Sequence, residues 1–344
     1  MSLLLAVTVS LAQKPDAADI YNRGLQKHGQ QDLDGALADY QQAIALKPKP
    51  ELLATIYLNR ANLMLAKGNV EAALLDLNLA VAAHPRSLLA YYNRGNLLAE
   101  TGKYEEAIAD YNRALEILPN FSMAFNNRGN ARKATGDIEG AIADFDQAIA
   151  AFPKNELGYF NRGIARQVKN DLDKALADYT QAIALKADFN EAYLNRGIVL
   201  QLQGKLDAAF ADFEKVIALK PDDADAYTNR GIIRKLKKDA AGALADFERA
   251  IATDPSNAVA YVHRGTLREE QGERKGALAD FNLAIAINPS LAQAYANRGV
   301  IRLQQGQVPQ AEQDFTKAIA LDGALKTSLE KYLAEMKRFR EKKP

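Results

Sequence analysis

The residues of this chain that could do chemistry form a repeated triplet, Asn-Arg-Gly. A primary amide both donates and accepts hydrogen bonds, and a guanidinium pairs with a carboxylate. From the second copy onward the triplets are 34 residues apart, and the first step is 37 residues. Nine copies at a fixed period predict a repeat array. The triplets begin at Asn22, Asn93, Asn127, Asn161, Asn195, Asn229 and Asn297, with the variants Asn59-Arg60-Ala61 and His263-Arg264-Gly265 between them.

Other chemistry has little support in the sequence. The histidines, His28, His84 and His263, are far apart, and no glycine-rich phosphate loop or nucleophile–base spacing is present. The chain has no cysteine, which excludes disulfides and thiolate chemistry. Its 44 basic and 43 acidic residues give a net charge of +1, which favours neither nucleic acid nor an anionic membrane as a partner. We therefore expect no enzyme activity and no cofactor.

Two helices per repeat must position the triplet. In residues 88–119, Tyr91, Gly95 and Leu98 fall on one helical stripe that ends at Gly102. Tyr104, Ala107, Tyr111 and Ala114 form a second stripe that ends at Pro119. Each of the nine copies has alanine at the position of Ala107, with an aromatic residue or leucine four residues later. This pattern predicts paired amphipathic helices.

This pattern resembles the tetratricopeptide repeat over residues 17–325, with tyrosine or phenylalanine where the family usually has tryptophan on its first helix. The resemblance implies an all-α fold, a right-handed superhelix (α-solenoid) of nine helix-turn-helix repeats. Residues 326–344 predict one more helix with a basic end, which we interpret as a polar cap for the array. Lys47-Pro48-Lys49-Pro50 contains the three extra residues of the first step and predicts a stiff link between repeats one and two.

Residues 1–12 differ from the rest because they form an uncharged apolar run that is too short to span a bilayer. Ser10 and Ala12 suit a cleavage site, so the run predicts a signal peptide and export to the periplasm or outside the cell. No basic residue follows Met1, and the alternative is an apolar cap on the first repeat of a cytoplasmic protein.

The asparagines of the triplet lie opposite the buried stripe of the first helix, because a helix turns about 100° per residue. The resemblance places that side on the concave wall and implies an asparagine ladder that holds peptide backbones, similar to the one in O-GlcNAc transferase. The alternative is a solvated polar stripe that repeat duplication copied along. The predicted ladder is Asn22, Asn59, Asn93, Asn127, Asn161, Asn195, Asn229 and Asn297, interrupted by His263.

Neighbours of the ladder add to the predicted binding surface, mainly in repeats two to five. Flanking apolar residues are Leu58, Tyr92, Phe160 and Leu194, and a second row of amides is Asn62, Asn96 and Asn130. Family members that grip a terminal carboxylate have lysine beside the ladder residue. Here Leu58, Tyr92, Asn126 and Phe160 occupy that position, which disfavours heat-shock chaperone tails as ligands.

Charged residues follow the same period. Arginine follows the ladder residue in all nine copies, and aspartate precedes the large residue of the second helix, as in Arg94 and Asp110. We expect nine structural Arg–Asp bridges, within a repeat or between adjacent repeats, rather than an acidic metal row or a basic phosphate row.

The sequence thus predicts a non-catalytic scaffold or assembly factor that binds a protein or peptide partner along the concave side. One alternative is an exported assembly factor that carries a metal such as manganese, which is implied by similar photosystem assembly proteins. Another is the regulatory subunit of a separate enzyme.

Overall fold

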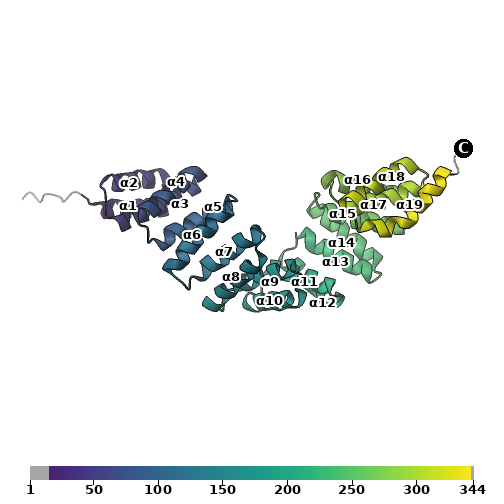
Figure 1. Cartoon of the computed structure of the whole chain (residues 1–344), viewed down its shortest axis with the longest axis horizontal. Coiled ribbons are helices and arrows are strands. Elements are labelled where there is room, and N and C mark those ends of the chain that lie inside the picture. The colour runs from purple at the N-terminus through teal and green to yellow at the C-terminus, as the bar shows by residue number, and fades with distance from the viewer. Residues whose placement is uncertain (1–14, 342–344) are drawn as a thin grey trace, which may run out of the picture. The chain divides into compact units, whose positions relative to one another are not determined.

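The computed structural model describes residues 15–341, and all regular elements in that range are α-helices (Figure 1). Residues 1–14 and 342–344 lie outside the described residues, and the predicted signal segment at 1–12 is among them. None of the described helices is both long enough and apolar enough to cross a bilayer. The chain divides into two compact units, residues 1–170 and 171–344, and each is described by itself.

The first unit contains four helix hairpins and one further helix. Each hairpin joins the two amphipathic stripes of one repeat through a short turn, so that the helices pack as neighbours. The helices are α1 (Ala17–Gly29), α2 (Leu33–Ala45), α3 (Pro50–Ala66), α4 (Val70–Ala83), α5 (Leu88–Glu100), α6 (Tyr104–Ile117), α7 (Ser122–Ala134), α8 (Ile138–Ala151) and α9 (Glu156–Val168).

The second unit begins with the second helix of repeat five and continues through four hairpins to a last single helix. The helices are α10 (Leu172–Leu185), α11 (Asn190–Leu202), α12 (Leu206–Leu219), α13 (Ala224–Leu236), α14 (Ala240–Thr253), α15 (Ala258–Glu270), α16 (Arg274–Ile287), α17 (Ala292–Gln304), α18 (Val308–Leu321) and α19 (Leu325–Glu341). The predicted all-α solenoid of helix-turn-helix repeats is confirmed in fold class, because this alternation of first and second helices runs through both units.

The turn inside most hairpins contains a residue in the left-handed region. Gly102, which the sequence marked as the end of a first helix, has φ 78°. Asn170 and Lys238 occupy the same place in repeats five and seven with φ 64°. The three extra residues before repeat two lengthen its first helix, because α3 begins at Pro50 and has 17 residues where α5 has 13. Proline is well suited to that first helical position.

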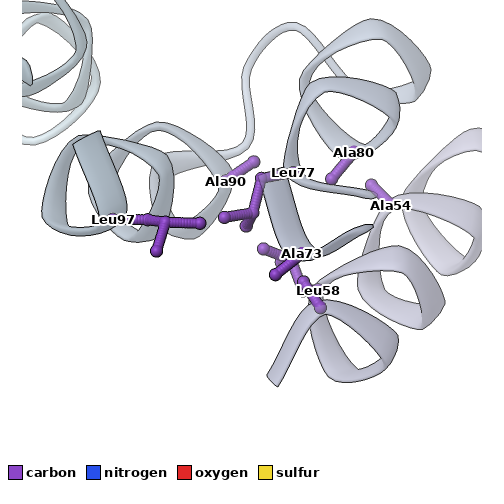
Figure 2. Packing of buried hydrophobic residues seen from close by; sticks show 8 residues of the cluster. Ala54, Leu58, Ala73, Leu77, Ala80, Ala90 and Leu97 are labelled. Carbon is purple, nitrogen blue, oxygen red and sulfur yellow. The ribbon is translucent and has the colours of Figure 1, made fainter. Parts of the chain in front are cut away.

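The core of each repeat pairs a small residue on the first helix with a large one on the second. A Cβ added to Gly95 would lie 2.9 Å from the ring of Tyr111, so glycine permits the close approach of the two helices. Repeat two has Ala61 and, in place of the ring, Leu77, and both are buried. Figure 2 shows this repeat, where Leu58 and Leu77 pack with small residues of α3, α4 and α5.

The Arg–Asp pairs join the two helices of one repeat, which decides between the two arrangements left open above. Arg94 donates to both carboxylate oxygens of Asp110 at 2.7 Å, and Asp110 is buried. The same guanidinium also reaches the preceding repeat, where Asn78 Oδ1 accepts at 2.9 Å. Eight such pairs lie within the units: Arg23–Asp39, Arg60–Asp76, Arg94–Asp110, Arg128–Asp144, Arg196–Asp212, Arg230–Asp246, Arg264–Asp280 and Arg298–Asp314.

Several of these aspartates have a second cation that the sequence reasoning did not anticipate. Arg132 lies one turn after Arg128 and donates to Asp144 at 2.9 Å. In repeat one, hydrogen bonds from Arg23 and then Lys27 lower the pKa of Asp39 to about 2. Each of the eight carboxylates is thus paired with at least one cation of its own repeat, as expected for structural bridges. The other second cations are Arg234 on Asp246, Arg268 on Asp280 and Arg302 on Asp314.

Helix α19 packs on α17 and α18 as the first helix of another repeat would. Leu329 and Met336 are buried there, and the ring of Tyr332 stacks on Phe315 with 6.1 Å between centroids. Leu333 occupies the position that glycine occupies in the full repeats. The capping role of residues 326–344 stays a prediction.

Candidate functional site

The ladder asparagines are on the first helices, on the side that faces away from the second helices. Asn22 is exposed and the other seven are partly exposed. Within the first unit, α1, α3, α5, α7 and α9 are consecutive neighbours, so their ladder residues form one row. In the second unit α11, α13, α15 and α17 are neighbours in the same way, with His263 within the row. We call this side of the first helices the ladder face.

The amide nitrogens of the ladder are mostly occupied within the chain. Asn127 Nδ2 donates to Tyr92 Oη at 3.1 Å and to Asn96 Oδ1 at 2.8 Å, both in the preceding repeat. Asn59 Nδ2 likewise reaches Tyr21 Oη at 2.9 Å and its own helix at 3.0 Å. An NH₂ group has two hydrogens, so these two residues have none left for a ligand. The remaining donors go from Asn161 to Asn126, from Asn195 and Asn229 to their own helices, and from Asn297 to Thr266.

The amide oxygens differ from the nitrogens. In the part of the chain that the structure describes, the oxygens of Asn59 and Asn161 accept no hydrogen bond, and Asn93 has no hydrogen-bond partner at all. Each oxygen can accept two bonds. Several ladder residues therefore offer a free acceptor, and a ligand N–H is the group that fits it. The predicted pairing of one asparagine with both groups of a peptide unit is available at Asn93 and at Asn161, which uses one of its two amide hydrogens.

The second amide row is partly used as well. Asn96 Oδ1 accepts from the buried Tyr111 hydroxyl at 2.9 Å in addition to Asn127. Asn62 is exposed and Asn130 is partly exposed. Burial raises the pKa of Tyr111, so its hydroxyl stays protonated and keeps its donor role at all ordinary pH values. Asn96 is a connector between repeats, whereas Asn62 and Asn130 face solvent.

The predicted apolar flanking residues are more buried than a binding surface requires. Leu58 is 7 % exposed and belongs to the core in Figure 2, so it offers no side-chain surface to a ligand. Tyr92 packs on Phe121 with 4.9 Å between ring centroids, and it uses its hydroxyl on Asn127. Phe160 and Leu194 are partly buried.

A different apolar row is exposed on the first unit, and the sequence reasoning missed it. Leu89, Met123 and Leu157 are 54 %, 55 % and 47 % exposed. Each lies four residues before a ladder asparagine, one turn away on the same helix face. That spacing was visible in the sequence and would have identified the row. Repeats six and seven have Glu191 and Asp225 at this position, so the apolar row is continuous in repeats three to five, and Val259 of repeat eight, which is 44 % exposed, stands apart from it.

A cavity of about 530 Å³ opens between α5 and α7 beside the ladder. Its floor is Tyr111, and amides from both helices line it. Two charged residues are at its edge, Glu100 and Lys133, and Lys133 is partly buried. The lining amides are Asn96, Asn127 and Asn130.

His263 replaces a ladder asparagine on α15. Its ring stacks on Phe247 with 5.8 Å between centroids and an interplanar angle of 19°. Burial, and to a smaller extent the charge of Lys235, lowers the pKa of His263 to about 4. The imidazole is therefore neutral at physiological pH and serves as an aromatic packing group. Across residues 15–341, no three histidine, aspartate or glutamate side chains gather where they could hold a metal ion.

Comparisons with known proteins agree with this architecture. Models described as tetratricopeptide repeat match residues 89–121, 191–223, 126–176, 237–292 and 262–325, and a model described as TPR repeat matches residues 169–204. Together they span more than half of the chain. No curated protein sequence matches it.

Solved structures show the same fold. A tetratricopeptide repeat protein from Parabacteroides merdae is 22 % identical, with a TM-score of 0.56 over 73 % of this chain and 98 % of that one. A chain of the APC/C hetero-tetramer Cut9–Hcn1 is 14 % identical, with a TM-score of 0.58 over 89 % of this chain and 74 % of that one. PilW, a type IV pilus biogenesis factor, is 21 % identical with a TM-score of 0.54, over 59 % of this chain and 94 % of PilW.

Proposed function

The chain belongs to the tetratricopeptide repeat family, and on this premise we propose that it is a non-catalytic scaffold that binds an extended segment of a partner protein. The binding surface is the ladder face of α5, α7 and α9. One observation carries the proposal: on three neighbouring helices an exposed apolar side chain lies one turn before a ladder asparagine, and the oxygens of Asn93 and Asn161 accept no hydrogen bond within the described residues. A soluble protein rarely maintains such a periodic apolar row without a partner.

The chemistry of the row selects an extended segment. A strand exposes its backbone N–H groups and alternates its side chains between two sides. The free oxygens of Asn93 and Asn161 can accept those N–H groups, while Leu89, Met123 and Leu157 can bury the ligand's apolar side chains. Backbone recognition of this kind tolerates many sequences, which suits a scaffold or an assembly factor.

Magnitudes limit the affinity. Each amide hydrogen bond contributes about 0.5–1.5 kcal/mol, and association costs about 4–15 kcal/mol. Because the three ladder residues of α5, α7 and α9 can form only a few such bonds, the amides alone do not offset that cost. Each apolar side chain that the ligand buries adds about 1.5–3 kcal/mol. We expect micromolar binding in which the amides contribute uniformly and the apolar row decides preference.

The test begins with selection of peptides from a random library on the full chain, followed by calorimetry of the peptides recovered. Asn93→Ala should weaken the binding of all these peptides by a similar factor of about three to ten. Because Asn93 makes no hydrogen bond within the described residues, the substitution removes only bonds to the ligand. Leu157→Ser should change the ranking of the peptides. Leu75→Ser is the matched control, since Leu75 is 59 % exposed on the second helix α4. Unchanged affinities in both ladder-face variants would refute the proposal.

A further inference from the structure

Lys133 is a partly buried cation without a counterion. It lies in the last turn of α7 at the edge of the cavity between α5 and α7. No carboxylate of the described residues is within ion-pair distance of its amine, although other lysines of this unit, Lys67 for example, have such partners. Burial lowers the pKa of Lys133, which shows that the amine has lost solvation without gaining an anion.

The same position three repeats later shows what is missing. Lys235 of α13 pairs with Glu270 of the following first helix at 2.9 Å. The residue that corresponds to Glu270 beside Lys133 is Val168 of α9, which is 63 % exposed. Lys235 is thus neutralised by the repeat that follows it, whereas the repeat that follows Lys133 has an exposed apolar residue at the corresponding position.

We propose that Lys133 binds the carboxylate of an acidic side chain in the extended segment, so that the ligand supplies the group that Glu270 supplies to Lys235. The inference rests on the function proposed above and adds a charge requirement to it. The carboxylate lies over Val168, with its methylene stem against the valine. The amides of Asn127 and Asn130 line the same cavity.

The apolar row lies at the first turns of α7 and α9, whereas Lys133 is in the last turn of α7, ten residues and about 15 Å along the helix from Met123. An extended segment that contacts both Met123 and Lys133 therefore needs about five residues between the two contacts. Glu100 is the opposing charge at the other edge of the cavity. Because Glu100 is exposed, water and salt screen it, whereas the partly buried Lys133 is screened less.

The probes are short acetylated and amidated peptides in which leucine and serine alternate around a central glutamate or glutamine. By fluorescence anisotropy on the full chain, we expect the glutamate peptide to bind about five- to tenfold more tightly than the glutamine peptide. Lys133→Met should reduce this ratio to about one. Val168→Glu should do the same without touching the lysine, because it rebuilds the pair seen at Lys235 and Glu270. Lys235→Met and Glu100→Gln are the controls, and both should keep the preference for glutamate.

The outcomes separate the two proposals. Equal binding of the glutamate and glutamine peptides overturns the acidic requirement and leaves the peptide scaffold intact. If only a peptide with a free terminal carboxylate binds tightly, the assignment to a side chain is wrong. If no peptide binds at millimolar concentration, the scaffold function fails and the inference fails with it. Equal melting temperatures of Val168→Glu and the parent exclude misfolding as the cause of a lost preference.

Discussion

His263 shows at the scale of one residue how an interruption of the ladder changes its chemistry. The amide oxygens of Asn59 and Asn161 accept no hydrogen bond within the described residues and are available to solvent, but the imidazole packs on Phe247 and loses its solvation. Besides burial, the charge of Lys235 lowers its pKa, although Glu270 pairs with that lysine. No carboxylate of the described residues forms an ion pair with the imidazole. The folded state therefore requires the neutral ring.

This requirement predicts a loss of stability in mild acid. The unfolded chain takes up a proton near pH 6.5, whereas the folded state takes one up only near pH 4. Between these two pH values only the unfolded chain binds the proton, so protonation favours unfolding. The stability that the buried neutral imidazole contributes is therefore complete above pH 6.5 and is lost as the pH falls from 6.5 to 4. At most about 3 kcal/mol is involved. His263→Asn should melt at nearly the same temperature at pH 7 and pH 4.5, compared with a clear drop for the parent.

A matched variant isolates the effect. His84→Asn removes a histidine outside the ladder and keeps His263, so its melting temperature should fall with pH as in the parent. If His263→Asn shows the same fall between pH 7 and pH 4.5, burial of this imidazole is not the cause.

At the scale of the element, the contact between a first helix and its second helix is a fitted pair. Glycine stands against an aromatic ring in most repeats, and alanine stands against leucine in repeat two. The combined volume of the two side chains is therefore similar in the two kinds of pair, as close packing requires. Glycine is intrinsically poor in a helix by about 1 kcal/mol, so its retention reflects the ring opposite.

Converting a glycine–aromatic pair into an alanine–leucine pair tests whether the two positions depend on each other. In Gly129→Ala the added Cβ would lie 2.7 Å from the ring of Phe145, and we expect a loss of about 1–3 kcal/mol despite the better helix propensity. Phe145→Leu alone should also destabilise, because it leaves a cavity. The double variant copies Ala61 and Leu77, and it should be more stable than the sum of the two losses predicts.

The control for this experiment is Gly29→Ala in α1, where an added Cβ meets nothing within 4 Å. It should be neutral or slightly stabilising in the same thermal melts. Strictly additive losses in the Gly129 and Phe145 variants would mean that the two positions do not constrain one another.

The helices could be predicted from the sequence, whereas many contacts of the ladder face could not. Periodicity and the Gly102 turn predict the helices, because helix geometry converts spacing into faces. The same geometry places the asparagines away from the core. Helix geometry alone does not predict that Asn127 donates both amide hydrogens to the preceding repeat, because these bonds depend on the distance between helices. Nor does it separate the buried Leu58 from the exposed Leu89.

At the scale of the whole molecule, an array that repeats one contact must end that contact somewhere. We expect helix α19 to do this in the second unit. It packs Leu329 and Met336 on apolar residues of α17 and α18, and it has Leu333 where the repeats have glycine or alanine. Export through residues 1–12 stays a prediction, because that segment lies outside the described residues.

Removing α19 should expose apolar surface at the end of the second unit and cause the protein to associate with itself. A chain truncated after Ala324 loses α19 and exposes the cluster that includes Leu303 and Phe315, both buried in the full chain. Because terminal repeats without a polar cover are poorly soluble, we expect a melting temperature lower by several degrees and concentration-dependent association. Light scattering coupled to size-exclusion chromatography measures the association. A chain truncated after Glu341 keeps the helix and should behave as the parent does. If the shorter chain keeps the parent's mass and melting temperature, α19 is an appendage and the array ends stably at α18.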